Sequence, residues 1–316
     1  MLFVIFFDFS IRTPVETGVR ALDGLLSVGA GQRIGLFAGT GVGKSTLLGM
    51  VARYTRADVN VICLVGERGR EVREFLEDDL GEEGLRKSVV FAATSDRSAM
   101  EKVYAAGFAT SVAEYFREQG MHVNLYMDSL TRYCMALREI GLASGDQIGV
   151  GGYPPGVWYR LSRLVERAGT TDTGSITGFY TVLVEADDLN DPVADNARGV
   201  LDGHVVLSRR LAQRSHYPSI EVTESISRVM DKVVSLEHRE DARRLRAILA
   251  AYRENEELIN LGAYARGSNA DVDEAIDKMQ AINRFLQQDV SDGTRFEESV
   301  RRLRELIGVA EEEEFY

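Results

Sequence analysis

A glycine-rich loop that directly follows a short apolar run constrains this chain more than any other feature. Residues 34–37 (Ile-Gly-Leu-Phe) suit a buried strand, and apolar residues recur at helical spacing from Ser45 to Tyr54. Between them lies the loop Gly39-Thr40-Gly41-Val42-Gly43-Lys44-Ser45-Thr46. Backbone N–H groups at the start of such a helix point toward an anion. The pattern therefore predicts a phosphate-binding loop between a strand and a helix.

The residue types of this loop match the chemistry of a bound nucleotide. Its three glycines let the backbone wrap closely around phosphates, Lys44 can reach the β and γ oxygens, and the Ser45 hydroxyl can ligate Mg²⁺. Ala38 stands where the general pattern has glycine, which is tolerated if its φ is negative. The alternative is a plain glycine-rich turn, and the strand, the glycines and the Lys-Ser pair together disfavour it.

Composition narrows the class of protein further. The 316 residues allow one large domain and a smaller one, and 45% hydrophobic with 27% charged residues is ordinary for a globular protein. The net charge of −12 argues against a main role in coating nucleic acid. Cys63 and Cys134 lie in apolar runs without metal-ligand spacing, so we expect buried thiols in a reducing compartment.

Residues 1–10 form an apolar leader with two possible origins. The segment Met1–Phe9 has no basic region and no small-residue cleavage site, so it does not match a signal peptide. It is either an edge strand left from a preceding domain or a leader introduced with cloning. No stretch of the sequence reaches the roughly 18 apolar residues that span a bilayer.

Two regions with different patterns follow the leader. Short apolar runs alternate with helical segments from Arg33 to about Val234, which predicts an α/β fold with a mostly parallel sheet flanked by helices. The expected strands after the phosphate loop cover 60–65, 88–93, 123–127, 178–184 and 203–208, and the expected helices cover 70–80, 100–119 and 159–167. Beyond residue 231 the chain is charged, periodic and free of strand patterns, with helical periodicity over 241–261, 272–289 and 295–307. We therefore expect an α/β domain over 11–231 and a small helical domain over 232–316. The run Glu311–Glu314 predicts a solvated acidic tail, with an interaction role as the alternative.

Carboxylates follow two of the predicted strands. Asp128 ends the apolar run Val123–Met127, where a nucleotide site needs a residue for the Mg²⁺ shell opposite Ser45. Glu67 follows the strand Asn60–Val65, which we expect to lie beside the strand that leads into the phosphate loop. A carboxylate at that edge could polarise an attacking water. Glu71 falls inside the next helix and suits a capping or surface role.

Several segments, taken in order, resemble the signature set of one enzyme family. The segments 38–45, 66–71 (Gly-Glu-Arg-Gly-Arg-Glu) and 218–227 resemble the rotary ATP synthase α/β superfamily. The match runs from about Thr17 to the C-terminus and is specific because independent motifs recur in order. Five more segments resemble the flagellar and type III secretion export ATPases within it: Val19–Gly24, Met127–Arg132, Gly152–Pro155, Leu161–Gly169 and Ala186–Pro192.

The resemblance implies a RecA-like core that hydrolyses ATP with Mg²⁺, and a role for each matching residue. It makes Glu67 the general base, helped by Arg68, which would hold Glu67 or a phosphate oxygen. Arg228 becomes an arginine finger for the neighbouring subunit's γ-phosphate. Tyr217 aligns with the residue that stacks on adenine, and Phe296 is a candidate for the opposing aromatic, with a core position as the alternative.

The same resemblance implies the setting of the enzyme. Family members work as homohexameric rings with stalk and regulator proteins and with chaperone–effector complexes, in the cytoplasm and peripherally at the inner face of the bacterial membrane. They energise unfolding of export substrates or release of their chaperones. Members also carry a small β-barrel domain ahead of the core, and no counterpart of it precedes Thr17 in this sequence.

Three alternatives remain open at this point. A rotary ATP synthase or vacuolar-type catalytic subunit shares the core, but the Gly-Tyr-Pro-Pro segment favours the export branch. A ring subunit that binds nucleotide without hydrolysing it could dispense with Glu67, which is present. An RNA-dependent helicase on the same core is disfavoured by the charge of −12, so we expect no nucleic-acid partner.

Overall fold

The structure is a computed structural model that describes residues 10–184 and 191–308. The leader Met1–Phe9, most of the Ala186–Pro192 motif and the acidic run Glu311–Glu314 lie outside the described residues. No helix in the described part is both long and apolar enough to cross a membrane.

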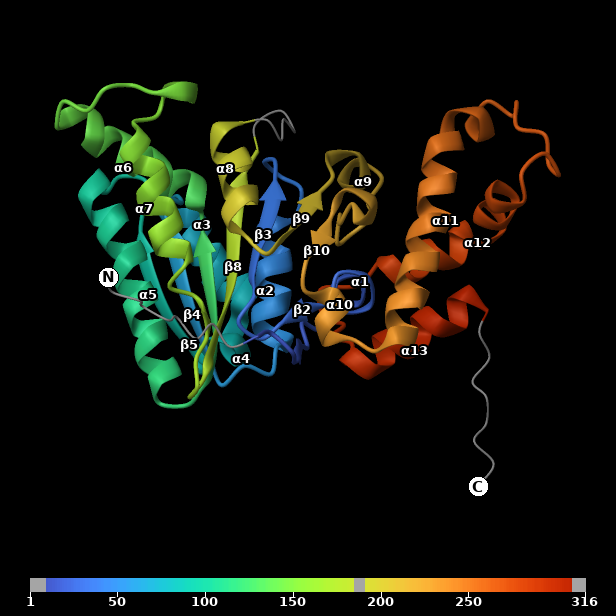
Figure 1. The fold of residues 1–316 in the computed structure, drawn as a ribbon, viewed down its shortest axis with the longest axis horizontal. Coiled ribbons are helices and arrows are strands. Elements are labelled where there is room, and N and C mark those ends of the chain that lie inside the picture. Colours follow the sequence, from blue (N-terminus) through green and yellow to red (C-terminus); the bar gives the residue numbers. More distant parts are fainter. Residues whose placement is uncertain (1–9, 185–190, 309–316) are drawn as a thin grey trace, which may run out of the picture.

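A mostly parallel sheet forms the centre of the larger region (Figure 1). Its strands lie in the order β10-β9-β3-β8-β6-β4-β5, with β7 paired to β8. Only β10 and β7 run antiparallel to their partners. This topology confirms the predicted fold class. The strands are β3 (Arg33–Ala38), β4 (Val59–Val65), β5 (Ser88–Ala93), β6 (His122–Asp128), β7 (Gly169–Thr170), β8 (Ser175–Leu183), β9 (Gly203–Leu207) and β10 (Ile226–Ser227), and a separate pair is formed by β1 (Pro14–Val15) and β2 (Val28–Gly29).

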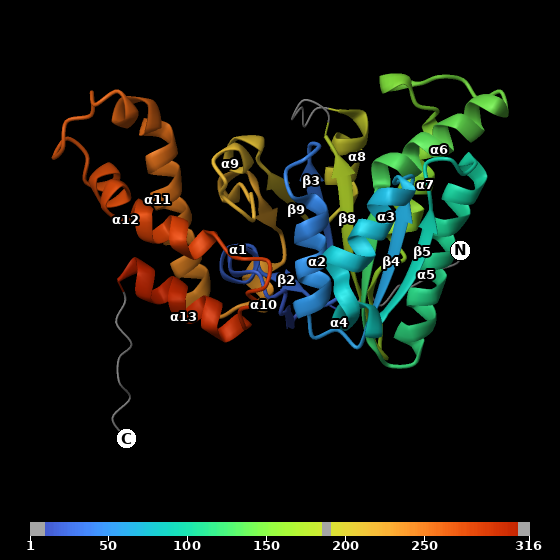
Figure 2. The same cartoon turned by 180° about the vertical axis from the view of Figure 1, so that it is seen from behind.

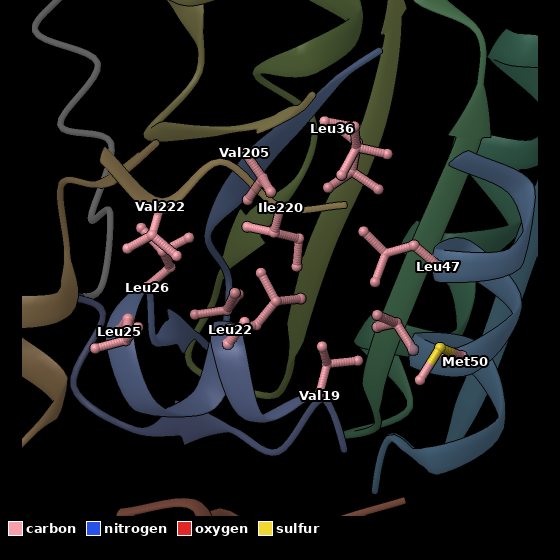
Figure 3. Close-up of a cluster of buried hydrophobic side chains, with 14 of the residues drawn as sticks. Val19, Leu22, Leu25, Leu26, Leu36, Leu47, Met50, Val205, Ile220 and Val222 are labelled. Carbon is pink, nitrogen blue, oxygen red and sulfur yellow. The ribbon is translucent and has the colours of Figure 1, made fainter. Parts of the chain in front are cut away.

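Apolar side chains leave the sheet on both faces and build two cores. In β4, Ile62 and Leu64 enter one core while Val61 and Cys63 enter the other, because successive strand residues point to opposite faces. The first core lies under α1 (Arg20–Leu25) and α2 (Lys44–Tyr54), and Figure 3 shows part of it. The second lies under four helices: α5 (Ala99–Glu118), α6 (Leu130–Ala143), α7 (Pro155–Val165) and α8 (Pro192–Val200).

Both cysteines lie in the second core, as expected for buried thiols. Cys63 and Cys134 are free and fully buried. Burial raises the pKa of Cys63 to about 12, so this thiol stays protonated at neutral pH.

The C-terminal region is helical, and its helices match the predicted segments closely. Among the described residues no strand follows Ser227. Figures 1 and 2 show the C-terminal helices at the opposite end of the molecule from α5 and α6. The domain limits 11–231 and 232–316 stay a prediction. The helices are α10 (Met230–Val233), α11 (Leu236–Asn260), α12 (Ala270–Leu286) and α13 (Phe296–Ile307).

A buried arginine near the N-terminus binds the C-terminal region to the rest of the molecule. Arg20, 5% exposed, donates from Nε to the carbonyl of Phe285 at 2.9 Å and forms an ion pair with Asp292 at 2.7 Å. The side-chain oxygen of Gln288 accepts from the Arg20 backbone N–H at 2.9 Å. The segment around α1 therefore packs with helices more than 200 residues away in sequence.

The helix predicted over Arg70–Leu80 is interrupted. The structure has α3 (Gly69–Glu74), a wider helical turn η1 (Phe75–Leu80) and then α4 (Gly81–Arg86). The turn η1 packs directly on α2 at Gly49, where a Cβ atom would lie 2.6 Å from the Asp79 carbonyl oxygen. The helix is interrupted where η1 contacts α2. A sequence pattern within 70–80 could not predict this contact, because α2 lies in a different part of the chain. Sequence patterns also missed α6, α8, α9 (Arg209–Gln213) and the short turns η2 (Val150–Gly152) and η4 (Val222–Glu224).

Candidate active site

The phosphate-binding loop has the backbone shape that its glycines predict. Gly41 and Gly43 have φ of 73° and 90°, in the region that favours glycine, and α2 begins directly after them at Lys44. Among the described non-glycine residues only Ser215 has a positive φ, so Ala38 meets the condition for replacing glycine. The N–H groups at the start of α2 are thus available to an anion.

Lys44 brings two carboxylates together at the carboxyl edge of the sheet. Its Nζ lies 2.5 Å from Oδ1 of Asp128 and 3.7 Å from Oε1 of Glu67. Asp128 is buried at the end of β6 and also accepts a hydrogen bond from the Thr181 hydroxyl at 2.7 Å. One cation therefore faces two carboxylates, which leaves this cluster with a net negative charge that Mg²⁺ would suit.

One expectation about this edge was wrong. We predicted that the strand before Glu67 lies beside the strand of the phosphate loop, but β8 and β6 separate β4 from β3. Glu67 still approaches Lys44 because all these parallel strands end at the same edge. Glu67 therefore lies at the predicted edge of the sheet, but the reason is the shared direction of the strands and not a pairing of β4 with β3.

Burial and neighbouring charges shift the pKa values of Glu67 and Lys44, the two groups that face Asp128. Burial, together with the charge of Asp128, raises the pKa of Glu67 to about 7, although the charge of Lys44 opposes both effects. Burial lowers the pKa of Lys44, but the charges of Asp128 and Glu67 outweigh this, and the pKa of Lys44 lies above its ordinary value. Lys44 is therefore charged, and Glu67 is poised to exchange a proton near neutral pH.

A cavity of about 550 Å³ opens at this edge. Its walls come from the phosphate loop, from Glu67 and from two residues that sequence reasoning left without a role, Ser95 and Arg132. Arg132 lies on the first turn of α6, four residues after Asp128, and that spacing was the signal that could have pointed to it. Thr181 was missed as well, because β8 joins β6 only through tertiary pairing. The Thr46 side chain donates to Asp79, a residue of η1.

Arg68 borders this cavity but does not hold Glu67. Its side chain is 80% exposed and lies 3.6 Å from Glu71, and its backbone N–H donates to the Glu71 carboxylate at 3.4 Å. Glu71 thus caps the start of α3, as predicted. Of the two roles expected for Arg68, the contact with Glu67 is not made, because the cap directs Arg68 toward Glu71. A contact with a phosphate oxygen stays a prediction.

Arg228 lies at the other end of the sheet. Its backbone N–H donates to the carbonyl of Asp202 at 3.0 Å, and the Asp202 N–H donates to the carbonyl of Arg33, the first residue of β3. The phosphate loop follows the last residue of β3, so the two ends are about 20 Å apart by strand length. Arg228 forms no ion pair with a carboxylate in the described part of the chain, and its guanidinium donates only to the Arg198 carbonyl at 3.2 Å. Arg228 therefore does not belong to the cavity of its own chain.

The two candidate aromatic residues are separated. The ring of Tyr217 lies 3.4 Å from where a Cβ on Gly43 would be, so it borders the phosphate loop. Phe296 packs edge-on against His238 and lines a small hollow with Arg56 and Ala57, beyond the far end of α2. The length of α2 alone is roughly 16 Å. Phe296 thus does not oppose Tyr217 in this structure; it is half-buried and packs against His238 outside both cores.

The donor set at the cavity fits Mg²⁺ bound together with a nucleotide. In the described residues no group of three or more His, Cys, Asp or Glu side chains could hold a metal ion by itself. Ser45 and Asp128 supply only two oxygen ligands. Because Mg²⁺ takes six oxygens, phosphate and water oxygens would have to complete its shell.

Comparison with known proteins defines the class. The family model for the ATP synthase alpha/beta family, nucleotide-binding domain, matches residues 18–227. The chain therefore belongs to the ATP synthase α/β family and is an ATPase. The model for the type III secretion EscN ATPase C-terminal domain matches residues 234–305, which defines the branch.

Relatives place the chain among the flagellar and type III secretion ATPases. It is 53% identical over 298 residues to the flagellum-specific ATP synthase of Bacillus subtilis, covering 94% of this chain and 68% of the relative. It is 54% identical over 293 residues to the type 3 secretion system ATPase of Xanthomonas euvesicatoria, covering 93% and 66%. The chain thus spans about two thirds of the length of these relatives.

Solved structures agree. A type III secretion ATPase from pathogenic bacteria superposes with a TM-score of 0.90 at 48% identity, covering 96% of this chain and 87% of that one. The assembled ATPase EscN from enteropathogenic E. coli gives 0.91 at 48% identity, covering 95% and 73%. The ATP synthase subunit NeqB, at 23% identity, shares the fold.

Proposed function

We propose that this chain hydrolyses Mg-ATP at the loop 39–46 and that hydrolysis energises protein export at a type III secretion or flagellar apparatus. The observation that carries the proposal is the convergence of Lys44, Glu67 and Asp128 at one edge of the sheet, beside the loop. The branch of the family supplies the export role, through unfolding of substrates or release of their chaperones.

Each residue of the cavity has a distinct task. The loop N–H groups and Lys44 bind the phosphates, and Ser45 and Asp128 would hold Mg²⁺, which when bound neutralises charge on the β- and γ-phosphate oxygens. Glu67 accepts the proton of the attacking water, helped by a pKa of about 7. Arg132, on the cavity wall, contributes a further positive charge toward the phosphates. Tyr217 contacts the adenine ring.

Arg228 acts in trans. It lies at the opposite end of β3 from its own phosphate loop and has no carboxylate partner among the described residues, so it can serve a neighbouring subunit. The assembled EscN, and its complex with the central stalk EscO, indicate the arrangement. We propose a homohexameric ring that binds a stalk protein, regulators and chaperone–effector complexes. It would work in the cytoplasm, peripherally at the inner face of the bacterial membrane.

Complementation between variants tests this function. Glu67→Gln keeps the shape of the side chain but cannot accept a proton, and Arg228→Ala removes the finger, so each protein alone should bind Mg-ATP and turn over at least about 100-fold more slowly. Mixed under assembling conditions, the two should regain hydrolysis, because some interfaces combine an intact Glu67 with an intact Arg228. Arg243→Ala, an exposed arginine with an ion pair at 3.4 Å, is the matched control and should keep full activity. Near-normal turnover of Glu67→Gln, or mixtures that stay inactive, would contradict the proposal.

A further inference from the structure

A hollow larger than the nucleotide cavity lies on another part of the molecule. It measures about 1150 Å³ and lies between α5 and α7, on the face of the sheet that carries the second core. Arg33, the first residue of β3, lines it, whereas the phosphate loop follows the last residue of that strand. This groove is therefore separate from the site of hydrolysis.

The groove is basic on a protein that is acidic as a whole. Its walls hold five arginines and two glutamates, a net charge of +3, while the chain carries −12. Both glutamates already have partners, since Arg167 binds Glu114 at 2.5 Å and Arg33 binds Glu166 at 2.7 Å. The remaining arginines are Arg117, Arg160 and Arg163, and none of them forms an ion pair with a described residue.

One of these arginines is fixed by the wall itself. Nη1 of Arg117 donates to the Arg167 carbonyl at 3.1 Å, which holds its guanidinium beside the groove.

Aromatic side chains line the same groove and are exposed to an unusual degree. Tyr104, Phe108 and Tyr159 are 67%, 66% and 65% exposed. Tyr104 and Phe108 are one helical turn apart on α5, so they present one continuous strip. Arg163 lies 5.7 Å above the ring of Tyr159. Clustered aromatic and arginine side chains on a surface are typical of the centre of protein interfaces.

We propose that this groove binds an acidic peptide segment that carries aromatic side chains, presented by a partner protein. Carboxylates of the segment pair with Arg160, Arg163 and Arg117, and its rings pack on Tyr104 and Phe108. Charge complementarity favours an acidic occupant, and the net charge of −12 on the whole chain disfavours a nucleic acid, whose row of phosphates would continue past the groove over an acidic surface. The proposal does not depend on ATP hydrolysis.

Fluorescence anisotropy with a labelled peptide, Glu-Glu-Phe-Glu-Asp-Tyr-Glu-Glu, tests the inference on the whole chain. Saturable binding should weaken at least tenfold in Arg160→Glu/Arg163→Glu and at least threefold in Tyr104→Ser/Phe108→Ser. A version with serine in place of both aromatic residues should bind at least threefold more weakly. The matched control Arg86→Glu/Arg243→Glu makes the same charge change on exposed arginines of α4 and α11 and should bind within twofold of the parent chain.

Three outcomes would overturn the proposal. Peptide affinity that is the same in the groove variants and the parent would remove the groove as its site. A twelve-residue oligothymidylate that binds more tightly than the peptide, and loses affinity in Arg160→Glu/Arg163→Glu, would make it a nucleic-acid groove. A change of oligomeric state in the groove variants by sedimentation would make it a contact between copies. Unchanged Mg-ATP affinity verifies that each variant is folded, and Tyr159→Ser replaces any variant that is not.

Discussion

Lys44 Nζ lies 2.5 Å from Oδ1 of Asp128, so the ammonium group of the phosphate loop neutralises the buried carboxylate at the end of β6. Other parts of the fold keep both residues in place. Lys44 is the first residue of α2, and the Thr181 hydroxyl donates to the Asp128 carboxylate at 2.7 Å. A single pair thus joins two elements that are 84 residues apart in sequence.

Removing Lys44 should affect two separate measurements, because this residue both binds the phosphates and neutralises Asp128. Lys44→Ala should weaken Mg-ATP binding at least tenfold by calorimetry, because the phosphates lose their closest cation. It should also lower the free energy of unfolding, because Asp128 is left buried without its counter-charge. Lys44→Ala/Asp128→Asn should recover that stability but not the binding. Full ATP affinity in Lys44→Ala would exclude the loop as the phosphate site.

Specific activity should depend on protein concentration. Because Arg228 lies away from its own cavity, hydrolysis requires a neighbour, and dilution should dissociate neighbours. We expect a mainly monomeric 316-residue chain at micromolar concentration, with specific activity that rises over a hundredfold concentration range in parallel with association measured by sedimentation. Specific activity that is constant over this range in a monomeric protein would show that catalysis needs no second subunit.

Arg20→Ala should destabilise the protein by about 3 kcal/mol, because the guanidinium is buried and several acceptors around it lose a charged hydrogen-bond donor. The loss leaves the carbonyl of Phe285 and the side chain of Asp292 without their donor. Urea unfolding measures the effect. Arg56→Ala is the control, since the Arg56–Glu16 pair involves a largely exposed arginine and should contribute less than about 1 kcal/mol. Equal effects of the two substitutions would mean that burial of Arg20 contributes nothing.

The stability of the protein should carry a pH dependence from Asp23. Burial raises the pKa of Asp23 to about 7 in the folded state, although hydrogen bonds from Thr17 and Gly18 oppose the shift. Between its ordinary pKa of 3.8 and about 7, the folded state keeps a proton that the unfolded state has lost. The free energy of unfolding therefore falls as pH rises through this window, by at most about 1.4 kcal/mol per pH unit.

Asp23→Asn has no proton to lose, so this part of the slope should disappear. The measurement is the difference in unfolding free energy between the parent chain and the variant at several values between pH 4.5 and 8. A difference that is independent of pH would show that the hydrogen bonds from Thr17 and Gly18 keep the folded-state pKa near its ordinary value.

The sequence by itself determined the local features. The strand, the glycine loop and the helix are adjacent in the chain, so residues 39–46 and the strand-end carboxylates Glu67 and Asp128 could be recognised without coordinates. The helices of the C-terminal region followed from the same local periodicity. The family motifs, which occur in the expected order along the chain, identified Arg228 and Tyr217 as further candidate site residues.

Only the tertiary structure decided which of these residues meet. In the folded sheet, β8 and β6 lie between β3 and β4. Arg228 lies at the opposite end of the sheet from the phosphate loop, and Phe296 lies at the far end of α2 from Tyr217. The fold also joins α5 to α7, so that arginines and aromatic residues from separate segments line one groove. Each of these relationships is a pairing between distant parts of the chain. Such pairings depend on how whole layers of helices and strands pack together, and a short sequence pattern cannot predict this packing.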